Sequence, residues 1–216
     1  DQLSGRSIKK AIARFVYSRV KKDIMGVITG DKSIGEVYSD NYAVISDVFG
    51  ESLRKPSRVP DVDFCILGVI NEGKGCLEVI RAIKNTKFSA VIAGHFSSEE
   101  YKNEVIREVG HASNIHVRDG YLSRNQYKLL IEKSRYAVLA YPIEFIRSSG
   151  FFYDALLSLR PVIVSSAPFF KIVEEKRLGL RYTKEFSEVL SLVKNEELYR
   201  DFQKNIEVFV SEKLMS

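Results

Sequence analysis

Short apolar runs alternate with segments of helical spacing from residue 63 onward, and this alternation constrains the fold more than any other feature. Apolar runs of strand length occupy residues 63–70, 89–94, 114–117, 136–141, 161–165 and 180–182. Segments with apolar residues at helical spacing lie between them, at residues 76–85, 98–109, 123–134, 150–158 and 169–176. Nearly continuous apolar strands joined by helices are typical of a parallel sheet that is covered on both faces. We therefore predict an α/β fold with a doubly wound, Rossmann-like parallel sheet.

The remaining parts of the chain predict a three-part organisation. Residues 1–55 contain two short apolar runs, 25–29 and 42–48, which are too few strands to bury a core alone. We expect this part to be the end of a preceding α/β domain, whose beginning lies outside this chain, together with a linker. Residues 56–195 form the main domain, which ends with a helical stretch at 185–194. Residues 196–216 form a C-terminal amphipathic helix that could cross back to the first domain.

Positive charge is concentrated at the start of the chain. Residues 1–22 carry a net charge of +6 and the remaining residues sum to −1, within a total of +5. Ile8, Ile12 and Phe15 recur at helical spacing, so the cations of residues 6–22 fall mostly on the polar face of an amphipathic helix. Such a face is most often simply solvated, and the alternative is peripheral contact with anionic lipid headgroups. Aromatic and basic residues do not interleave as in single-strand-binding proteins, so we predict no nucleic-acid partner.

The cysteine content indicates a reducing compartment. Cys65 and Cys76 are the two cysteines, and Cys65 lies inside an apolar run where a free thiol behaves as a small hydrophobe. The longest mostly apolar stretch, residues 136–146, is shorter than the roughly 18 residues that a membrane-spanning helix needs, and Pro142 interrupts it. We expect a cytoplasmic protein, with contact at the inner face of the membrane as the peripheral alternative.

The loop after the first apolar run offers a candidate anion site. Residues 68–75 read GVINEGKG, which differs from the P-loop motif GxxxxGK[ST] because Gly75 stands where a magnesium-binding hydroxyl is required. No later strand ends in the aspartate that would hold the metal, so a P-loop NTPase is not predicted. Lys74 and Gly75 at a helix N-terminus still present an ammonium and free amides, which a diphosphate fits. A solvated lysine in a flexible loop is the alternative.

A second candidate anion site lies at the start of the helical segment 150–158. Ser148, Ser149 and Gly150 supply hydroxyl groups and exposed amides there, and Arg147 adds a guanidinium beside them. Asp154 follows about one turn into the helix, where its carboxylate could accept hydrogen bonds from two ribose hydroxyl groups. Ordinary helix capping by the serines, and an acid favoured by the helix dipole, are the alternatives.

Taken together, these motifs resemble the C-terminal, donor-binding domain of GT-B glycosyltransferases, especially the family 4 group of glycosyl transferases group 1. The similar features cover roughly residues 63–183. They are the glycine and Lys-Gly pair of residues 68–75, Gly-Tyr-Leu at 120–122, Tyr-Pro-x-Glu at 141–144, Ser-Gly-x(3)-Asp-Ala at 149–155 and Leu-Arg-Pro-Val-Ile-Val at 159–164.

The resemblance implies a role for several of these residues. Lys74 maps onto the lysine that contacts the donor diphosphate, and Asp154 onto the acid that contacts the ribose. Ile146 occupies the place of the family's first glutamate, with Glu144 and Arg147 flanking it, and Arg147 could replace an arginine that the family has where this chain has Val69.

Other polar residues are weaker candidates. Tyr121, in the loop after the third strand, could border the nucleotide base or could simply pack. His95 follows a strand end and is read as a lone surface histidine. His111 and His116 have no carboxylate at ligand spacing, so we predict no metal site.

These observations predict the donor-binding portion of a metal-independent glycosyltransferase of hexosyltransferase type. Its substrate would be a nucleotide-diphosphate sugar, with no further cofactor, and its acceptor a glycan, a lipid-linked glycan or a cell-surface polysaccharide. We expect this portion alone to be inactive, and catalytic residues are not identified. The alternative is a non-catalytic nucleotide or nucleotide-sugar binding module. A response-regulator receiver, the third option, needs an acidic cluster at strand ends, whereas Asp63 begins its strand.

Overall fold

The computed structural model describes residues 27–29, 42–44, 59–145 and 148–215 of the 216-residue chain. The chain divides into two compact units, Asp1–Val48 and Phe49–Ser216. In the first unit, strands β1 (Val27–Thr29) and β2 (Tyr42–Val44) pair in parallel, at the two places where short apolar runs occur. The basic segment 6–22 lies outside the described residues.

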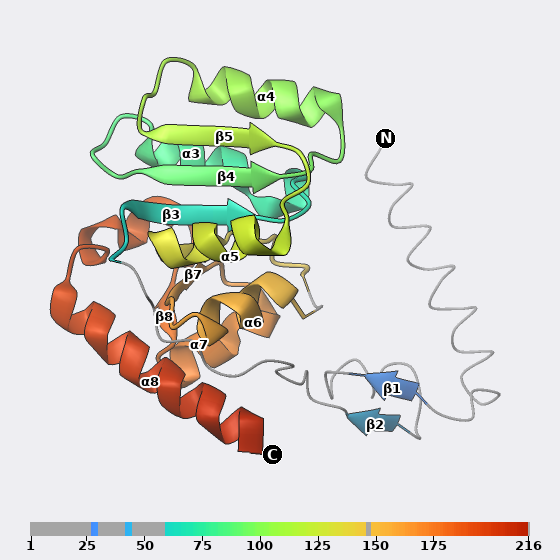
Figure 1. Ribbon diagram of the computed structural model, residues 1–216, viewed down its shortest axis with the longest axis vertical. Coiled ribbons are helices and arrows are strands. Elements are labelled where there is room, and N and C mark those ends of the chain that lie inside the picture. The colour runs from blue at the N-terminus through green and yellow to red at the C-terminus, as the bar shows by residue number, and fades with distance from the viewer. Residues whose placement is uncertain (1–26, 30–41, 45–58, 146–147, 216) are drawn as a thin grey trace. The chain divides into compact units, whose positions relative to one another are not determined.

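The second unit contains a six-stranded sheet in which every neighbouring pair is parallel (Figure 1). The strand order is β5-β4-β3-β6-β7-β8. The strands are β3 (Val62–Leu67), β4 (Ala90–Gly94), β5 (Ile115–Asp119), β6 (Ser134–Leu139), β7 (Val162–Val164) and β8 (Gly179–Arg181). The order runs outward in both directions from the β3–β6 pair, so the chain reverses its winding there. The predicted doubly wound, Rossmann-like α/β fold is confirmed.

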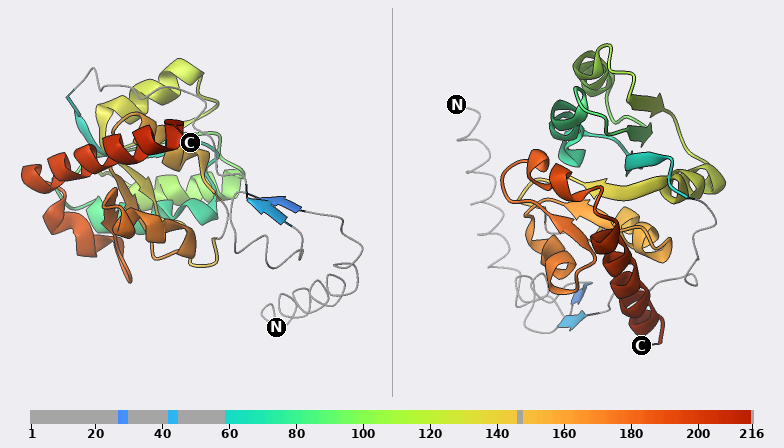
Figure 2. Two further views of the ribbon diagram at one scale, coloured as in Figure 1. Left: turned by 90° about the horizontal axis from the view of Figure 1, so that it is seen from below. Right: turned by 90° about the vertical axis from the view of Figure 1, so that its left-hand side faces the viewer.

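Helices cover both faces of this sheet, as two further views show (Figure 2). The α-helices are α3 (Cys76–Ile83), α4 (Glu99–Val109), α5 (Arg124–Lys133), α6 (Gly150–Leu157), α7 (Lys171–Glu175) and α8 (Glu196–Met215). Three short 3-10 helices accompany them, η2 (Glu72–Lys74), η3 (Pro168–Phe170) and η4 (Phe186–Leu192). Helix α4 begins at a serine cap, because the Ser98 hydroxyl accepts a hydrogen bond from the Tyr101 amide.

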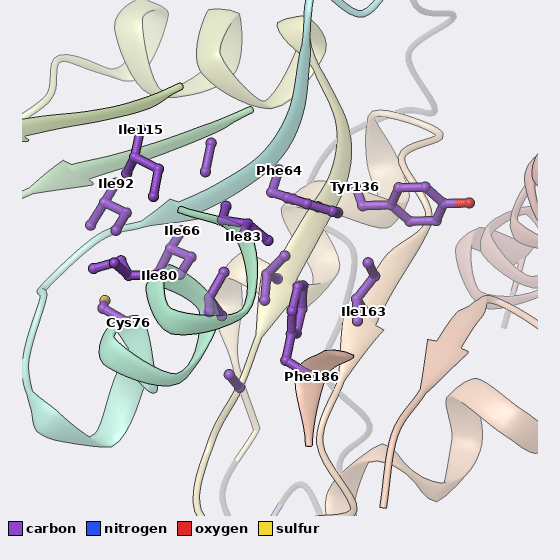
Figure 3. Close-up of a cluster of buried hydrophobic side chains, with 14 of the residues drawn as sticks. Phe64, Ile66, Cys76, Ile80, Ile83, Ile92, Ile115, Tyr136, Ile163 and Phe186 are labelled. Carbon is purple, nitrogen blue, oxygen red and sulfur yellow. The ribbon is translucent and has the colours of Figure 1, made fainter. Parts of the chain in front are cut away.

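Alternating strand residues build a separate core on each face. Phe64 and Ile66 of β3 pack with α3, α4 and η4 on one face, where Figure 3 shows them beside Ile80 and Phe186. Cys65, the residue between them, belongs to the cluster on the other face, which α5, α6 and α8 cover. Because successive side chains of a strand point to opposite faces, only a nearly continuous apolar run can serve both cores. This explains why the runs are apolar throughout rather than alternating.

The C-terminal segments differ in part from the predicted helices. Residues 186–192 form a 3-10 helix, not the α-helix expected over 185–194. A capping box opens this helix, and the Glu188 carboxylate also accepts hydrogen bonds from the amides of Thr183 and Lys184 just before it. Helix α8 then extends over 20 residues and packs against α6. Its Ile206 is fully buried in the core of the second unit.

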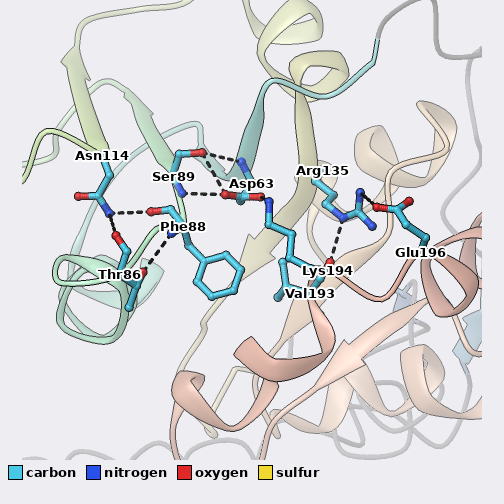
Figure 4. A network of polar contacts seen from close by, with 9 residues as sticks. All are labelled: Asp63, Thr86, Phe88, Ser89, Asn114, Arg135, Val193, Lys194 and Glu196. Atoms are coloured by element: carbon cyan, nitrogen blue, oxygen red, sulfur yellow. Dashed lines mark hydrogen bonds and ion pairs between the residues drawn. The ribbon is translucent and has the colours of Figure 1, made fainter.

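A polar network ties this C-terminal part to the amino ends of the strands (Figure 4). The Asp63 carboxylate accepts hydrogen bonds from the amide and hydroxyl of Ser89, at 2.8 and 3.2 Å, and pairs with Lys194. Arg135 forms an ion pair with Glu196 at the start of α8, with 2.9 Å between the charged atoms. Asp63 therefore has a structural role at the edge of the sheet opposite to the carboxyl ends of the strands.

Candidate functional site

The loops that follow β3, β4, β5 and β6 lie at the carboxyl edge of the sheet, where open α/β sheets bind ligands. Gly75 brings the loop after β3 into contact with the loop after β6. It has a left-handed conformation (φ 65°), ends η2 and precedes α3. A Cβ atom at Gly75 would lie 2.1 Å from the carbonyl oxygen of Ala140, so only glycine allows the start of α3 to approach the end of β6 this closely.

This approach places the Lys74 ammonium at the point where the winding reverses. Its Nζ donates hydrogen bonds to the Tyr141 hydroxyl at 2.8 Å and to the Leu67 carbonyl at 3.4 Å. The same nitrogen lies 4.9 Å from the centre of the Tyr141 ring and 5.8 Å from that of Phe151. Lys74 is half-buried. It therefore presents its charge from a defined position and not from a solvated arm.

The start of α6 reaches the same place through Ser149. This residue is 7% exposed and occupies the N-cap position, but its side chain does not cap the helix. Its hydroxyl oxygen lies 3.0 Å from the Tyr141 hydroxyl, within hydrogen-bond distance. The prediction that the Ser149 hydroxyl caps the helix is thus wrong, because this hydroxyl forms its hydrogen bond with Tyr141. Ser148 and Gly150 are exposed, and a Cβ atom at Gly150 would meet nothing within 4 Å.

Asp154 faces helix α5 from the next turn of α6. Its carboxylate accepts a hydrogen bond from Tyr127, and the cations of Lys128 and Arg124 lie near it. Desolvation raises the pKa of Asp154 above its usual value, and these partners offset only part of the rise. The Tyr127 ring packs edge-on against Phe151, with 6.2 Å between ring centres. Phe151 therefore borders both Tyr127 and the Lys74 ammonium.

The ends of β4 and β5 carry an exposed aromatic pair. His95 and Tyr121 stack with ring centres 4.7 Å apart and an angle of 14° between the ring planes. Tyr121 is 81% exposed. Each ring follows a glycine with positive φ, Gly94 at 144° and Gly120 at 122°, and the Gly120 amide donates to the Gly94 carbonyl at 3.1 Å. His95 is therefore not a lone surface histidine but half of a two-ring surface.

Glu144 and Arg147 are two further residues that the sequence predicts for the site. Glu144 lies in an exposed turn between β6 and α6. Arg147 lies outside the described residues, so its expected role stays a prediction.

A cleft of about 320 Å³ opens beside Tyr141, between the start of α3 and the ends of β6, β7 and β8. Its lining includes residues that sequence analysis did not select, namely Glu72, Glu78, Ser165, Ser166, Tyr182 and Lys184. The rule that ligands bind at the carboxyl ends of strands could have found the residues that follow β7 and β8. The Glu78 carboxylate accepts hydrogen bonds from the Tyr182 hydroxyl and the Phe186 amide, and burial raises the pKa of this carboxyl.

A larger cleft of about 660 Å³ lies between the ends of α3 and α4, at residues 84–86 and 107–114. It is at the amino edge of the sheet, where the Glu108 carboxylate is already paired with Lys84 and Arg81. We therefore assign the candidate site to the carboxyl edge.

In the described part of the chain, no three His, Cys, Asp or Glu side chains are grouped so that they could hold a metal ion. Among the described helices, none combines the length and apolar character that crossing a bilayer requires.

Comparison with known proteins gives matches of structure only. No family model matches the sequence, and no curated protein is similar to it. The C-terminal domain of LpcC, a glycosyl transferase group 1 family protein from Francisella tularensis, superimposes with a TM-score of 0.59 and 20% sequence identity, over 71% of this chain and 86% of that one.

Two further structures match more of this chain. HepE from Anabaena, in complex with UDP-glucose, has a TM-score of 0.74 and 15% identity over 99% of this chain and 66% of its own length. TarM from S. aureus has a TM-score of 0.68 and 17% identity over 95% of this chain and 44% of its own length. This chain thus spans less than two thirds of either protein. Its sheet and helices have the fold of the C-terminal domain of GT-B glycosyltransferases of group 1, as the resemblance in sequence implies.

Proposed function

We propose that this chain is the donor-binding portion of a glycosyltransferase that moves a sugar from a nucleotide-diphosphate sugar to a glycan, a lipid-linked glycan or a cell-surface polysaccharide. The observation that carries the proposal is the meeting of Lys74 with the start of α6 where the sheet reverses its winding. A cation and a helix N-terminus at this place suit a diphosphate. The HepE structures in complex with UDP and with UDP-glucose support a nucleotide sugar as the ligand.

The remaining site residues suit the other parts of such a donor. Tyr121 and His95 offer exposed ring faces on which a base can stack. In this proposal the Asp154 carboxylate accepts hydrogen bonds from ribose hydroxyl groups, and the hydroxyl and carboxylate groups of the cleft beside Tyr141 contact the sugar.

Electrostatic stabilisation is the catalytic contribution that this arrangement can make. In the reaction, the bond from the anomeric carbon to the diphosphate oxygen breaks, and the diphosphate leaves with the electron pair. A bond to an acceptor oxygen forms at the same carbon, and the acceptor loses its proton. Lys74 and the α6 amides would stabilise the charge that develops on the diphosphate. We propose that this requires no metal ion.

The test is calorimetric titration of the chain with UDP, GDP, ADP and their common sugar conjugates. We expect saturable binding of one nucleotide, which Lys74→Ala and Asp154→Ala each weaken by tenfold or more, roughly the loss of one hydrogen bond to a charged group. Lys133→Ala is the matched control, because Lys133 pairs with Asp61 away from the site. Failure of all these nucleotides to bind would contradict the proposal.

A non-catalytic nucleotide-binding module is the second candidate, favoured by the exposed Val69 where the family has arginine. In that case the sugar conjugate would bind no more tightly than the nucleotide, and adding the rest of a complete enzyme would restore no transfer. We expect the opposite, with little turnover by this chain alone.

A further inference from the structure

Tyr141 links the two halves of the candidate diphosphate site by a chain of hydrogen bonds. Its hydroxyl accepts from Lys74 Nζ at 2.8 Å and lies 3.0 Å from Ser149 Oγ. An ammonium only donates, so the tyrosine oxygen is the acceptor in the first bond. Either hydroxyl can be the donor in the bond between Tyr141 and Ser149, and the three groups form one hydrogen-bonded chain. Such chains polarise each member and strengthen the bonds.

The Tyr141 ring is held in place from several directions. It is 5% exposed and packs against Phe145, at 4.4 Å between ring centres, and against Phe170, at 5.6 Å. The Ser165 hydroxyl donates a hydrogen bond to the Tyr141 carbonyl and so fixes its backbone. The position of the hydroxyl group is therefore set by the core and not by its two polar partners.

We propose that Tyr141 is a positioning residue that holds the Lys74 ammonium and the start of α6 in register for one diphosphate. The inference rests on the proposed function and deepens it. Tyr141 occupies one of the three donors of the Lys74 ammonium, and the Leu67 carbonyl receives a second at a longer distance. Among the described residues the third donor has no acceptor, so it is available to a ligand.

Tyr141 also keeps the Ser149 hydroxyl away from the helix amides that this residue would ordinarily cap. The Phe152 and Tyr153 amides donate to the Ser149 carbonyl, so among the described residues the Gly150 and Phe151 amides are the ones left for an anion. A lysine already held in place loses less conformational freedom when it binds, which increases affinity without a new contact.

The test compares the whole chain with its Tyr141→Phe and Ser149→Ala variants in titrations with inorganic diphosphate, UDP and uridine. Tyr141→Phe keeps the packed ring and removes only the hydroxyl. We expect it to weaken binding of inorganic diphosphate and UDP about tenfold, the effect of one hydrogen bond to a charged group, and to leave uridine unchanged. We expect Ser149→Ala to act on the same two ligands by a smaller factor, because it leaves the bond between Lys74 and Tyr141 in place.

Tyr199→Phe is the matched control. Tyr199 is also buried, and its hydroxyl accepts a hydrogen bond from a cation, Arg160, at 3.2 Å, but it lies on α8. We expect this variant to bind all three ligands as the unchanged chain does, and thermal unfolding shows whether both phenylalanine variants are folded.

The outcomes separate the inference from the proposed function. If Tyr141→Phe binds inorganic diphosphate as tightly as the unchanged chain does, the inference is overturned. The proposed function is still upheld in that case if the unchanged chain binds UDP. An equal loss for uridine and diphosphate would also overturn the inference, since that marks a general structural role. Binding of inorganic diphosphate but of no nucleotide, with the tenfold effect present, would support the inference and reject the function. Absence of binding by all three ligands would reject both.

Discussion

Asp154, the proposed ribose ligand, lies against α5 in an environment that disfavours its charge. Its half-buried carboxylate has Tyr127 as a donor and the cations of Lys128 and Arg124 nearby, yet desolvation still raises its pKa. A folded-state pKa above the unfolded value means that the folded protein binds this proton more tightly. The group therefore favours folding at pH values below its ordinary pKa of 3.8, and this contribution is lost as the pH rises through the raised value.

We predict that Asp154→Asn stabilises the protein at pH 7 and lowers its affinity for a nucleotide diphosphate about tenfold. The amide oxygen can still accept from Tyr127, but it carries no charge to desolvate and is a poorer acceptor for ribose hydroxyl groups. Urea unfolding at pH 7 and near pH 3.5 measures the first effect, and calorimetry the second. A stability gain of the same size at both pH values would contradict the explanation, because the carboxyl is protonated in acid.

At the scale of elements, the ends of β3 and β4 approach each other so closely that side chains are excluded. Gly94 has φ 144°, and a Cβ atom there would lie 1.8 Å from the carbonyl oxygen of Gly68. The contact sets the starting point of the loop that carries His95, so it positions the aromatic pair as well as the strands. Gly120, at the end of β5, has a similar φ of 122° but nothing within 4 Å of the same position.

We predict that Gly94→Ala lowers the free energy of unfolding by about 3 kcal/mol or more, the sum of backbone strain and overpacking. Gly120→Ala, which adds only the strain, should cost about 1–2 kcal/mol. Urea unfolding of both variants measures the difference, and the gap between them isolates the clash with Gly68. Equal losses would show that conformation alone, and not the contact between strand ends, makes glycine necessary at Gly94.

At the scale of the whole molecule, charge and ligand site are separated along the chain. The net charge of +6 lies in residues 1–22, outside the described part, whereas the candidate site belongs to the second unit. A lipid-linked acceptor, if the proposed function holds, would bring the protein to a membrane surface. We propose that the basic segment 6–22 serves this attachment at the inner, cytoplasmic face, since each lysine or arginine near an anionic surface contributes about 1 kcal/mol.

We predict that the chain sediments with vesicles that contain phosphatidylglycerol, but not with pure phosphatidylcholine, and that 0.5 M salt releases it. Reversal of two charges, Lys9→Glu with Lys10→Glu, should abolish most of this binding. The control reverses two exposed charges elsewhere, Lys176→Glu with Lys204→Glu, and changes the net charge equally. If both double variants lose binding alike, net charge and not the basic segment is responsible.

Much of the fold was predictable because both faces of the sheet are covered. Complete coverage requires strands that are apolar throughout, and the helices between them then show helical spacing over a single buried face. Loop position and motif selected Lys74 and Asp154, and their roles at the site stay predictions. The 3-10 form of residues 186–192 was not predictable, because apolar spacing over so short a segment does not distinguish a 3-10 helix from an α-helix.

The sequence by itself determined the order of strands and helices and the class of sheet, because these follow from local periodicity, and the class of sheet predicts a site at the carboxyl edge. Only the tertiary structure decided which side chains share that edge. In the sequence Tyr141 is only the first residue of a motif and Ser149 a possible helix cap, yet Tyr141 contacts both Ser149 and Lys74, which lies 67 positions before it. Such contacts depend on how β3 and β6 pair, and no local pattern records that pairing.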